Sequence, residues 1–262
     1  HLSLRRQRQM CIRDSAWRAA RWIAAKIGDK NRKRDMNYDF DFSFLRQYWP
    51  MLMEGALMTA ELSVFATILG FLLGTLCAVG STSRSAWVRA LVAVYVEVIR
   101  NTPLLVQLFV VFFGLASIGL KFSVTASAVI GLTINIGAYS SEIIRAGIES
   151  IHKGQAEAAD CLGLARWQVV LKVILPPAIE KVYPALASQY VLLMLGTSIA
   201  SQISAEELTG IASRIQSDTF RSFEVFLVVA VIYLALSFVM RGLFWAVGQL
   251  VFPRLRRLGT SL

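Results

Sequence analysis

The sequence predicts an all-α membrane protein with five transmembrane helices. Of the 262 residues, 56% are hydrophobic and 17% are charged, and the mean hydropathy is +0.57. Water-soluble domains carry about 25% charged residues. About 20 apolar helical residues cross the hydrocarbon of a bilayer. The stretches without Asp, Glu, Lys or Arg that approach or exceed this length are 62–83, 101–120, 122–141, 182–205 and 225–240.

The first two spans follow from the first two stretches. We expect the first at about 60–82, where Gly70 and Gly74 form a small-residue pair that lets helix backbones approach closely. We expect the second at about 102–120, with Pro103 at its start, where a missing N–H costs nothing. Both must be helices, because backbone polar groups in lipid need partners within the segment.

The remaining three spans are expected at about 123–144, 181–199 and 224–246. Gly137 and Ser141 give the third span a small-residue pair of its own. None of the five segments shows the alternation, about 10 residues long, of a transmembrane β-strand. The chain therefore resolves into helices joined by polar segments.

Basic residues orient these spans. With Met36 outside, twelve Lys and Arg residues fall on inner segments and four on outer ones. Since basic residues concentrate on cytoplasmic segments, we expect a multi-pass membrane protein with its N-terminus outside and a basic cytoplasmic tail at 254–262. Residues 81–100 are expected to lie along the inner face. Arg100 would then anchor at the inner headgroup level.

The N-terminal tail, 1–35, is expected to lie apart from the transmembrane domain, 36–253. It holds 11 Lys and Arg and 3 Asp and Glu, which opposes this orientation. Residues 9–15 match a translated sequencing adapter, so at least 1–15 is interpreted as a gene-model artefact, and Met36 as the start. A genuine basic cytosolic tail is the alternative. Because a membrane-embedded body follows, we expect no nucleic-acid partner.

No residue pattern indicates catalysis or a resident cofactor. The cysteines and histidines are scattered, without metal-ligand spacing. No Gly-rich phosphate-binding loop or hydrolase motif occurs. We therefore expect a chain that is not an enzyme, with no metal site and no cofactor of its own.

The polar segment 151–176 carries the functional motif. Its characteristic residues are Glu157, Ala158, Ala159, Gly163 and Pro176. The alanines suit a helix with a low surface, and Gly163 can take the left-handed conformation that ends one. Glu157 offers a single charge to a basic partner. Such a short, rigid peg suits docking into a groove of another protein. A solvated hairpin is the alternative.

This segment resembles the EAA coupling loop of permease subunits in binding-protein-dependent ABC importers. The resemblance implies a type I importer core in which the loop docks on an ATPase dimer that binds ATP and Mg. It also implies a location in the bacterial inner membrane, a second permease subunit, a periplasmic solute-binding protein and alternating access. In that reading, Glu157, Ala158, Ala159 and Gly163 couple ATP hydrolysis to transport.

Further segments resemble the polar amino-acid branch of these permeases. They are Glu97 to Gln107, Gly137 to Arg145, Thr197-Ser198 and Glu207-Leu208. Leu195-Gly196 departs from that branch, where a basic or polar residue often precedes the Thr-Ser pair, and this weakens the case for a substrate contact there. Glu142 and Arg145 lie three apart and could pair on one helical face.

Polar residues within the spans are candidates for the substrate path. They are Asn135, Thr133, Thr197 and Ser198. Asn135 offers donors and an acceptor to an amino acid, although it could equally join two helices. The hydroxyl groups could bond their own helix instead.

The predicted function is inward transport of polar amino acids, with glutamate or aspartate, glutamine and basic amino acids as the candidates. The alternatives are a permease for another small polar solute, or a stand-alone secondary transporter. The latter would show internal repeats and ionisable groups in mid-span.

Overall fold

The computed structural model describes residues 21–22 and 40–252, and these residues form helices and no strands. The all-α prediction is thus confirmed for the described part of the chain. The expectations for the two tails fall almost entirely on residues 1–20, 23–39 and 253–262, which lie outside the described residues. The helices below belong to one compact unit, Phe42–Leu262.

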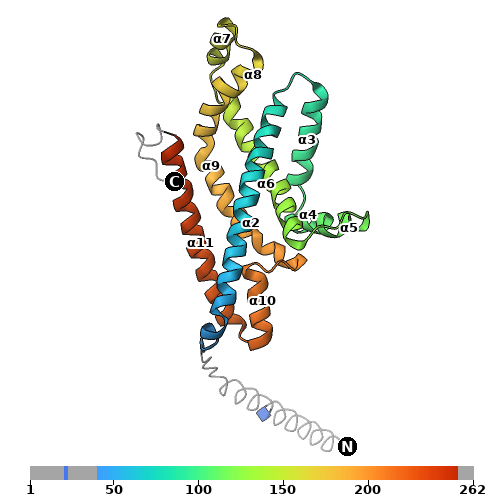
Figure 1. Cartoon of the computed structure of the whole chain (residues 1–262), viewed down its shortest axis with the longest axis vertical. Helices are drawn as coiled ribbons and strands as arrows, with labels where there is room; N and C mark the ends of the chain where they lie inside the picture. Colours follow the sequence, from blue (N-terminus) through green and yellow to red (C-terminus); the bar gives the residue numbers. More distant parts are fainter. Residues whose placement is uncertain (1–20, 23–39, 253–262) are drawn as a thin grey trace, which may run out of the picture. The chain divides into compact units, whose positions relative to one another are not determined.

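Four long helices run side by side along this unit (Figure 1). They are α2 (Phe44–Ser81), α6 (Val124–Glu149), α9 (Leu175–Gly196) and α11 (Ser222–Val251). Shorter elements are α3 (Ala86–Arg100), α4 (Leu104–Phe109), η1 (Val110–Gly114), α5 (Leu115–Ser117), α7 (Lys153–Cys161), α8 (Arg166–Gln168), η2 (Val169–Ile174), η3 (Thr197–Ile203) and α10 (Leu208–Thr219). Helices α7 and α8 form one end of the unit, and α10 lies near the other.

Helices α2 and α6 meet at glycine. A Cβ added at Gly74 would lie 2.6 Å from the Ser140 Cβ and 2.9 Å from the Gly137 carbonyl oxygen. A Cβ at Gly70 would lie 2.1 Å from the Ile136 Cγ2. The small-residue pair on α2 therefore sits at the contact between the two helices, as such pairs do in membrane bundles.

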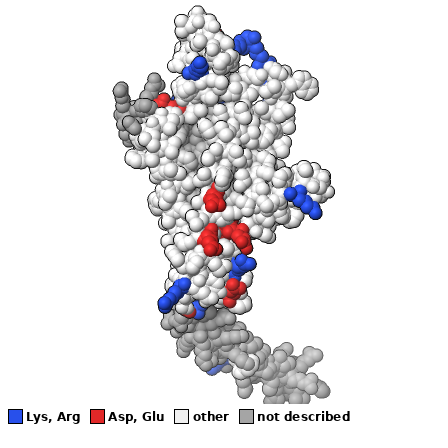
Figure 2. All heavy atoms as spheres, viewed as in Figure 1, with Lys and Arg blue, Asp and Glu red and all other residues white. Residues whose placement is uncertain are grey.

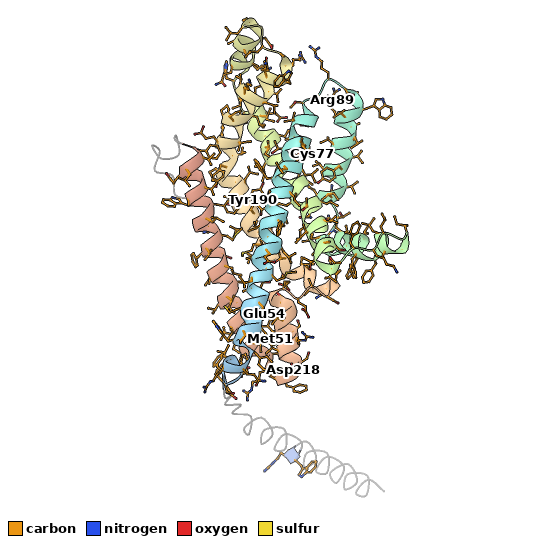
Figure 3. The ribbon with its side chains drawn as sticks, in the orientation of Figure 1. Met51, Glu54, Cys77, Arg89, Tyr190 and Asp218 are labelled. Atoms are coloured by element: carbon orange, nitrogen blue, oxygen red, sulfur yellow. The ribbon has the colours of Figure 1, made fainter. Side chains whose placement is uncertain are left out.

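Helix α2 starts earlier than the expected first span, 60–82. It has 38 residues, about 57 Å at 1.5 Å per residue, whereas the hydrocarbon is about 30 Å thick. Glu54 and Glu61 lie on this helix and are exposed. Figure 2 shows acidic side chains gathered over one half of the face in view, and Figure 3 places Glu54 where α2 passes α10. A search for runs without charged residues stops at Glu61 and so misses the first part of α2. Glutamate does not interrupt a helix, because it is a good helix former.

The segment expected as the second span, about 102–120, contains the helical elements α4, η1 and α5. The segment from Leu104 to Ser117 bends by 110° away from α3. Proline lacks an N–H and restricts the residue before it, so the Thr102-Pro103 pair interrupts the helix.

Helix α3 runs back beside α2 and α6. The sequence placed residues 81–100 along the inner face of the membrane. The Tyr95 hydroxyl donates to the Ile134 carbonyl of α6 at 2.7 Å. Since α3 has 15 residues, Arg100 lies about 21 Å along the axis from Ala86. The expected position of Arg100 at the inner headgroup level stays a prediction.

The number of spans stays a prediction. Among residues 21–22 and 40–252, three helices, α2, α6 and α11, are long and apolar enough to cross a membrane, and the bent pair of α3 with 104–117 would make four. Helix α9 covers most of the expected fourth span, 181–199, but it carries Glu180 and Lys181 near its start.

Candidate functional site

A cavity of about 580 Å³ lies where the α3–α4 break faces α6 and α9. The break contributes Arg100 and Asn101, α6 contributes Asn135 and Tyr139, and α9 contributes Gln189. The apolar walls are formed by Leu104, Ile136, Leu192 and Leu193. A cavity with apolar walls and a few polar groups suits a small polar ligand.

Gln107 holds the break in place. Its side chain is buried, and its Nε2 lies 2.7 Å from the Ile99 carbonyl and 3.0 Å from the Thr102 carbonyl. Its Oε1 accepts a hydrogen bond from the Asn135 Nδ2 at 2.9 Å. The Ile99 carbonyl, whose i+4 donor would be the missing N–H of Pro103, and the Thr102 carbonyl at the break thus both accept from this side chain. Asn135 is tied to the break as well as facing the cavity.

Arg100 is the cationic group of the cavity wall. Its Nη1 lies 3.3 Å from the Glu142 Oε2, and its guanidinium lies 5.7 Å from the centre of the Tyr139 ring. Guanidinium over an aromatic face is a favourable arrangement. The Arg100 side chain keeps 42% of its surface exposed, so it can meet an anionic ligand.

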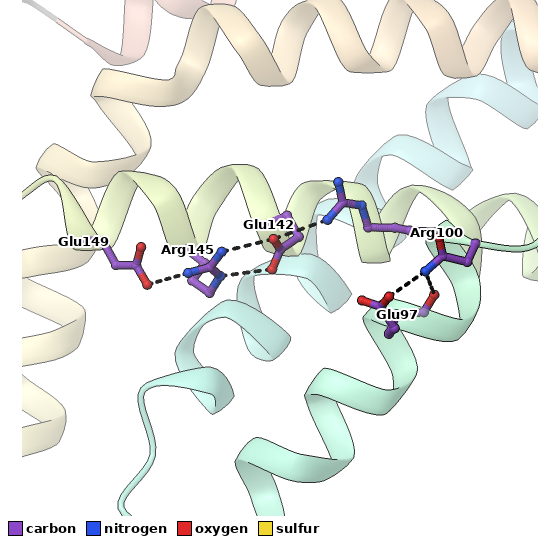
Figure 4. A network of polar contacts seen from close by, with 6 residues as sticks. Glu97, Arg100, Glu142, Arg145 and Glu149 are labelled. Atoms are coloured by element: carbon purple, nitrogen blue, oxygen red, sulfur yellow. Dashed lines mark hydrogen bonds and ion pairs between the residues drawn. The ribbon is translucent and has the colours of Figure 1, made fainter.

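Further ion pairs continue along α6 (Figure 4). The Arg145 Nε and Nη2 donate to the two oxygens of Glu142, at 2.9 and 3.1 Å, and its Nη1 pairs with Glu149. The predicted Glu142–Arg145 pair is therefore present. The same carboxylate also faces Arg100, which lies on another helix, and no periodicity of α6 could indicate that contact.

Of the four predicted substrate-path residues, the structure places one in the cavity. Asn135 lines it. The Thr197 and Ser198 hydroxyls donate to the carbonyl groups of Met194 and Leu195, at 2.6 and 2.8 Å, within their own helical segment. The Thr133 Oγ1 is buried without a partner among the described residues.

Sequence reasoning missed Gln107, Tyr139 and Gln189, and it gave Arg100 a different place. Gln189 is the one amide side chain between residues 175 and 196, and that was the available signal. Arg100 directly precedes Asn-Thr-Pro, so the helix break itself was a signal that its side chain could face inward.

The coupling-loop candidates lie on and just after α7. His152 caps the helix, its Nδ1 accepting from the Gly154 N–H at 3.1 Å. At the other end Gly163 has φ +74°, and the Gly163 and Leu164 N–H groups bond the Asp160 and Ala159 carbonyls at 2.9 and 3.3 Å. This pattern is a Schellman motif, which favours glycine at that position.

Exposure along α7 separates its two faces. Ala159 is buried, whereas Glu157 and Ala158 are exposed. Two large apolar side chains beyond the helix, Leu162 and Trp167, are 81% and 59% exposed. The loop therefore presents two acidic groups, Glu157 and Asp160, and these two apolar groups outward, which suits a protein partner.

Glu207 is a fully buried carboxyl group at the start of α10. It caps that helix by accepting from the Gly210 N–H at 2.8 Å, and it accepts from the Tyr233 hydroxyl of α11 at 2.7 Å. Thr59 of α2 donates to the same carboxyl group at 3.5 Å. Burial raises the pKa of Glu207. This group joins three helices.

A family model described as "Binding-protein-dependent transport system inner membrane component" matches residues 70–253. The chain is 39% identical over 211 residues to the "Glutamine transport system permease protein GlnP" of Escherichia coli (strain K12), covering 78% of this chain and 96% of the relative. It is 34% identical over 227 residues to the "Octopine transport system permease protein OccM" of Rhizobium meliloti, covering 83% and 93%.

The fold of this chain is similar to that of chains in solved ABC transporter structures. A chain of "an amino acid ABC transporter with histidines" superposes with a TM-score of 0.72 and 35% identity, over 80% of this chain and 99% of that one. A chain of the "MetNI methionine ABC transporter" superposes with a TM-score of 0.68 at 19% identity, over 78% and 98%, which speaks for the fold alone. Among the described residues no cluster of His, Cys, Asp and Glu could hold a metal ion.

Proposed function

The chain belongs to the family of binding-protein-dependent transport system inner membrane components, and we propose how its cavity and its α7 loop serve that family's activity. It is the permease subunit of an amino-acid ABC importer, a transport component with several membrane helices and the predicted type I fold. Two features are left to propose: the solute that binds in the cavity, and the surfaces through which the chain binds its partner proteins.

We infer that the cavity takes a polar amino acid. Arg100 would bind the α-carboxylate, since guanidinium and carboxylate form strong charge-assisted hydrogen bonds. Asn135 and Gln189 line the same cavity and offer amide donors and acceptors to a polar side chain. No carboxylate occurs among the described lining residues, which favours an uncharged side chain such as that of glutamine over a basic one. The combination of Arg100 with two amides carries this proposal.

We propose that α7 and Gly163 dock on an ATPase dimer, which binds ATP and Mg. The exposed Glu157 and Ala158, together with Leu162 beyond the helix, support a docking role. A second permease subunit and a periplasmic binding protein complete the proposed importer. The N-terminus would lie outside and the C-terminus in the cytoplasm.

The cavity is tested by equilibrium binding of radiolabelled glutamine to the purified permease–ATPase complex without binding protein. Hydrogen bonds to a charged group contribute about 1.5–3 kcal/mol, so Arg100→Gln should weaken binding by about tenfold or more. Arg89→Gln is the matched control. Arg89 lies on the same helix near the α2–α3 turn and donates to the Ser83 and Arg84 carbonyls (Figure 3).

Unchanged affinity in Arg100→Gln would refute the carboxylate site. Competition with unlabelled glutamate, arginine and a sugar decides the solute class. Preferential competition by arginine would contradict the choice of an uncharged side chain, and competition by the sugar alone would favour a permease for another polar solute.

A further inference from the structure

Four side chains form a continuous series of ion pairs from the cavity wall to the end of α6. They are Arg100, Glu142, Arg145 and Glu149, named here the α6 ion-pair ladder (Figure 4). From Glu142 to Glu149 the ladder follows α6 for about 10 Å. Glu149 is the last residue of that helix, and α7 begins at Lys153. The ladder therefore connects the cavity with the start of the coupling loop.

Glu142 is shared between two arginines. Its Oε2 lies 3.3 Å from the Arg100 Nη1 and accepts from the Arg145 Nη2 at 3.1 Å. The Glu142 side chain is 29% exposed, whereas Glu149 at the far end is 61% exposed. Glu142 is thus the member most shielded from solvent, and its ion pairs are the least screened by solvent.

The ladder is balanced, with two positive and two negative side chains. A carboxylate that enters the cavity adds a negative charge beside Arg100 and competes with Glu142 for the same guanidinium. Arg100 can then face the ligand or Glu142, and these arrangements are alternatives. A ligand shifts such an equilibrium through its different affinity for the two states.

We propose that the α6 ion-pair ladder communicates occupancy of the cavity to the α7 loop. When a carboxylate binds Arg100, Glu142 loses one cationic partner and holds Arg145 more strongly. Arg145 is drawn away from Glu149, and the last turn of α6 loosens next to the loop. Arg145 and Glu149 are positioning residues in this scheme, since neither lines the cavity. The inference rests on the proposed amino-acid site at Arg100.

The experiment compares two measurements on the whole importer with its ATPase and binding protein. One is equilibrium binding of radiolabelled glutamine to the permease–ATPase complex. The other is the increase in ATP hydrolysis caused by glutamine-loaded binding protein. Glu149→Gln and Arg145→Gln should keep glutamine affinity within about twofold and lose at least about fivefold of the stimulation, equivalent to about 1 kcal/mol of coupling.

Two further variants sharpen the comparison. Glu149→Asp keeps the charge and should restore most of the stimulation that Glu149→Gln loses. Arg89→Gln, on α3 but outside the ladder, should leave both measurements unchanged. A charge effect predicts this difference between Asp and Gln, whereas loss of a helix-end side chain alone does not.

The outcomes separate the ladder from the cavity. If Glu149→Gln and Arg145→Gln keep full stimulation while Arg100→Gln loses glutamine binding, the ladder is refuted and the cavity stands. If both ladder variants lose glutamine affinity together with stimulation, the ion pairs merely hold the cavity in shape, and the ladder is again refuted. If Arg100→Gln binds glutamine normally, the amino-acid site itself is wrong.

Discussion

Hydrogen-bond partners distinguish polar residues that look alike in the sequence. Thr197 and Ser198 bond carbonyl groups of their own helical segment, which is the usual choice of short hydroxyl side chains in helices. Asn135 on α6 is longer and reaches Gln107 on α4. Side-chain reach therefore decides which of the predicted candidates faces the cavity.

The buried carboxyl of Glu207 makes stability depend on pH. Its pKa is raised above the ordinary value of 4.5, chiefly by burial, so the folded state holds the proton more tightly than the unfolded state. The stabilisation from protonation is complete below the unfolded pKa, and it is lost as the pH rises through the folded pKa. Glu207→Gln should keep the cap on Gly210 and lose this dependence, so the variant gains relative stability as the pH rises above about 4.5.

The measurement is the thermal unfolding midpoint in detergent at a series of pH values. Glu206→Gln is the matched control, because the neighbouring Glu206 side chain is 73% exposed. It should follow the wild-type protein at every pH. A wild-type protein that gains stability over Glu207→Gln with rising pH would show that the sign is wrong.

At the scale of elements, the end of α7 depends on a left-handed residue. Gly163 has φ +74°, and a Cβ there would meet nothing within 4 Å, so the strain of a substitution is conformational. A residue with a Cβ pays about 1–2 kcal/mol in that conformation, and a β-branched one suffers most. Gly163→Val should distort the docking peg and reduce ATP-driven uptake about tenfold in proteoliposomes.

The control is Gly119→Val, because Gly119 has φ +92° and equally open surroundings far along the chain from α7. Glu157→Arg tests the same peg without backbone strain, and it should also uncouple ATP hydrolysis from uptake. Normal transport by both Gly163→Val and Glu157→Arg would exclude α7 as the coupling element.

The α2–α6 contact should be intolerant of even one methyl group. A Cβ at Gly74 would lie 2.6 Å from the Ser140 Cβ and 2.9 Å from a backbone oxygen, so the helices must separate. Overpacking of this kind costs about 1–3 kcal/mol. Gly74→Ala should therefore lower stability against unfolding in detergent by that amount.

Gly242→Ala on α11 is the matched comparison, because a Cβ there meets nothing within 4 Å. Alanine is the better residue within a helix by about 0.5–1 kcal/mol, so this variant should be slightly more stable. Equal effects of the two substitutions would argue against close packing at Gly74.

At the scale of the whole molecule, the orientation proposed from basic residues can be tested at Cys161. This cysteine is exposed at the end of α7, whereas Cys77 is half-buried. With Cys11 and Cys77 replaced by serine, a membrane-impermeant maleimide should label Cys161 in inside-out vesicles and leave it unlabelled in intact cells. Labelling in intact cells would reverse the proposed orientation.

The fold was predictable where its causes are local along the chain. Composition and long apolar runs predict helices in a membrane, and the Gly163 end of α7 follows from a short contiguous motif. The start of α2 at Phe44 and the packing of α3 beside α2 and α6 were not predicted. Charge counting overlooks Glu as a helix former, and a proline break shows where a helix stops without showing which way the chain turns.

By itself the sequence determined that this protein is a membrane helix bundle, identified its family and pointed to the loop that we propose couples it to an ATPase, because hydropathy and contiguous motifs do not depend on distant contacts. Only the tertiary structure decided the cavity, which assembles residues from α3, α6 and α9 that lie as far apart as Arg100 and Gln189. The packing of α6 against two other helices turns separate polar residues into one site, and it sets Arg100 beside Glu142. Such contacts depend on the relative position of whole helices, which no local pattern specifies.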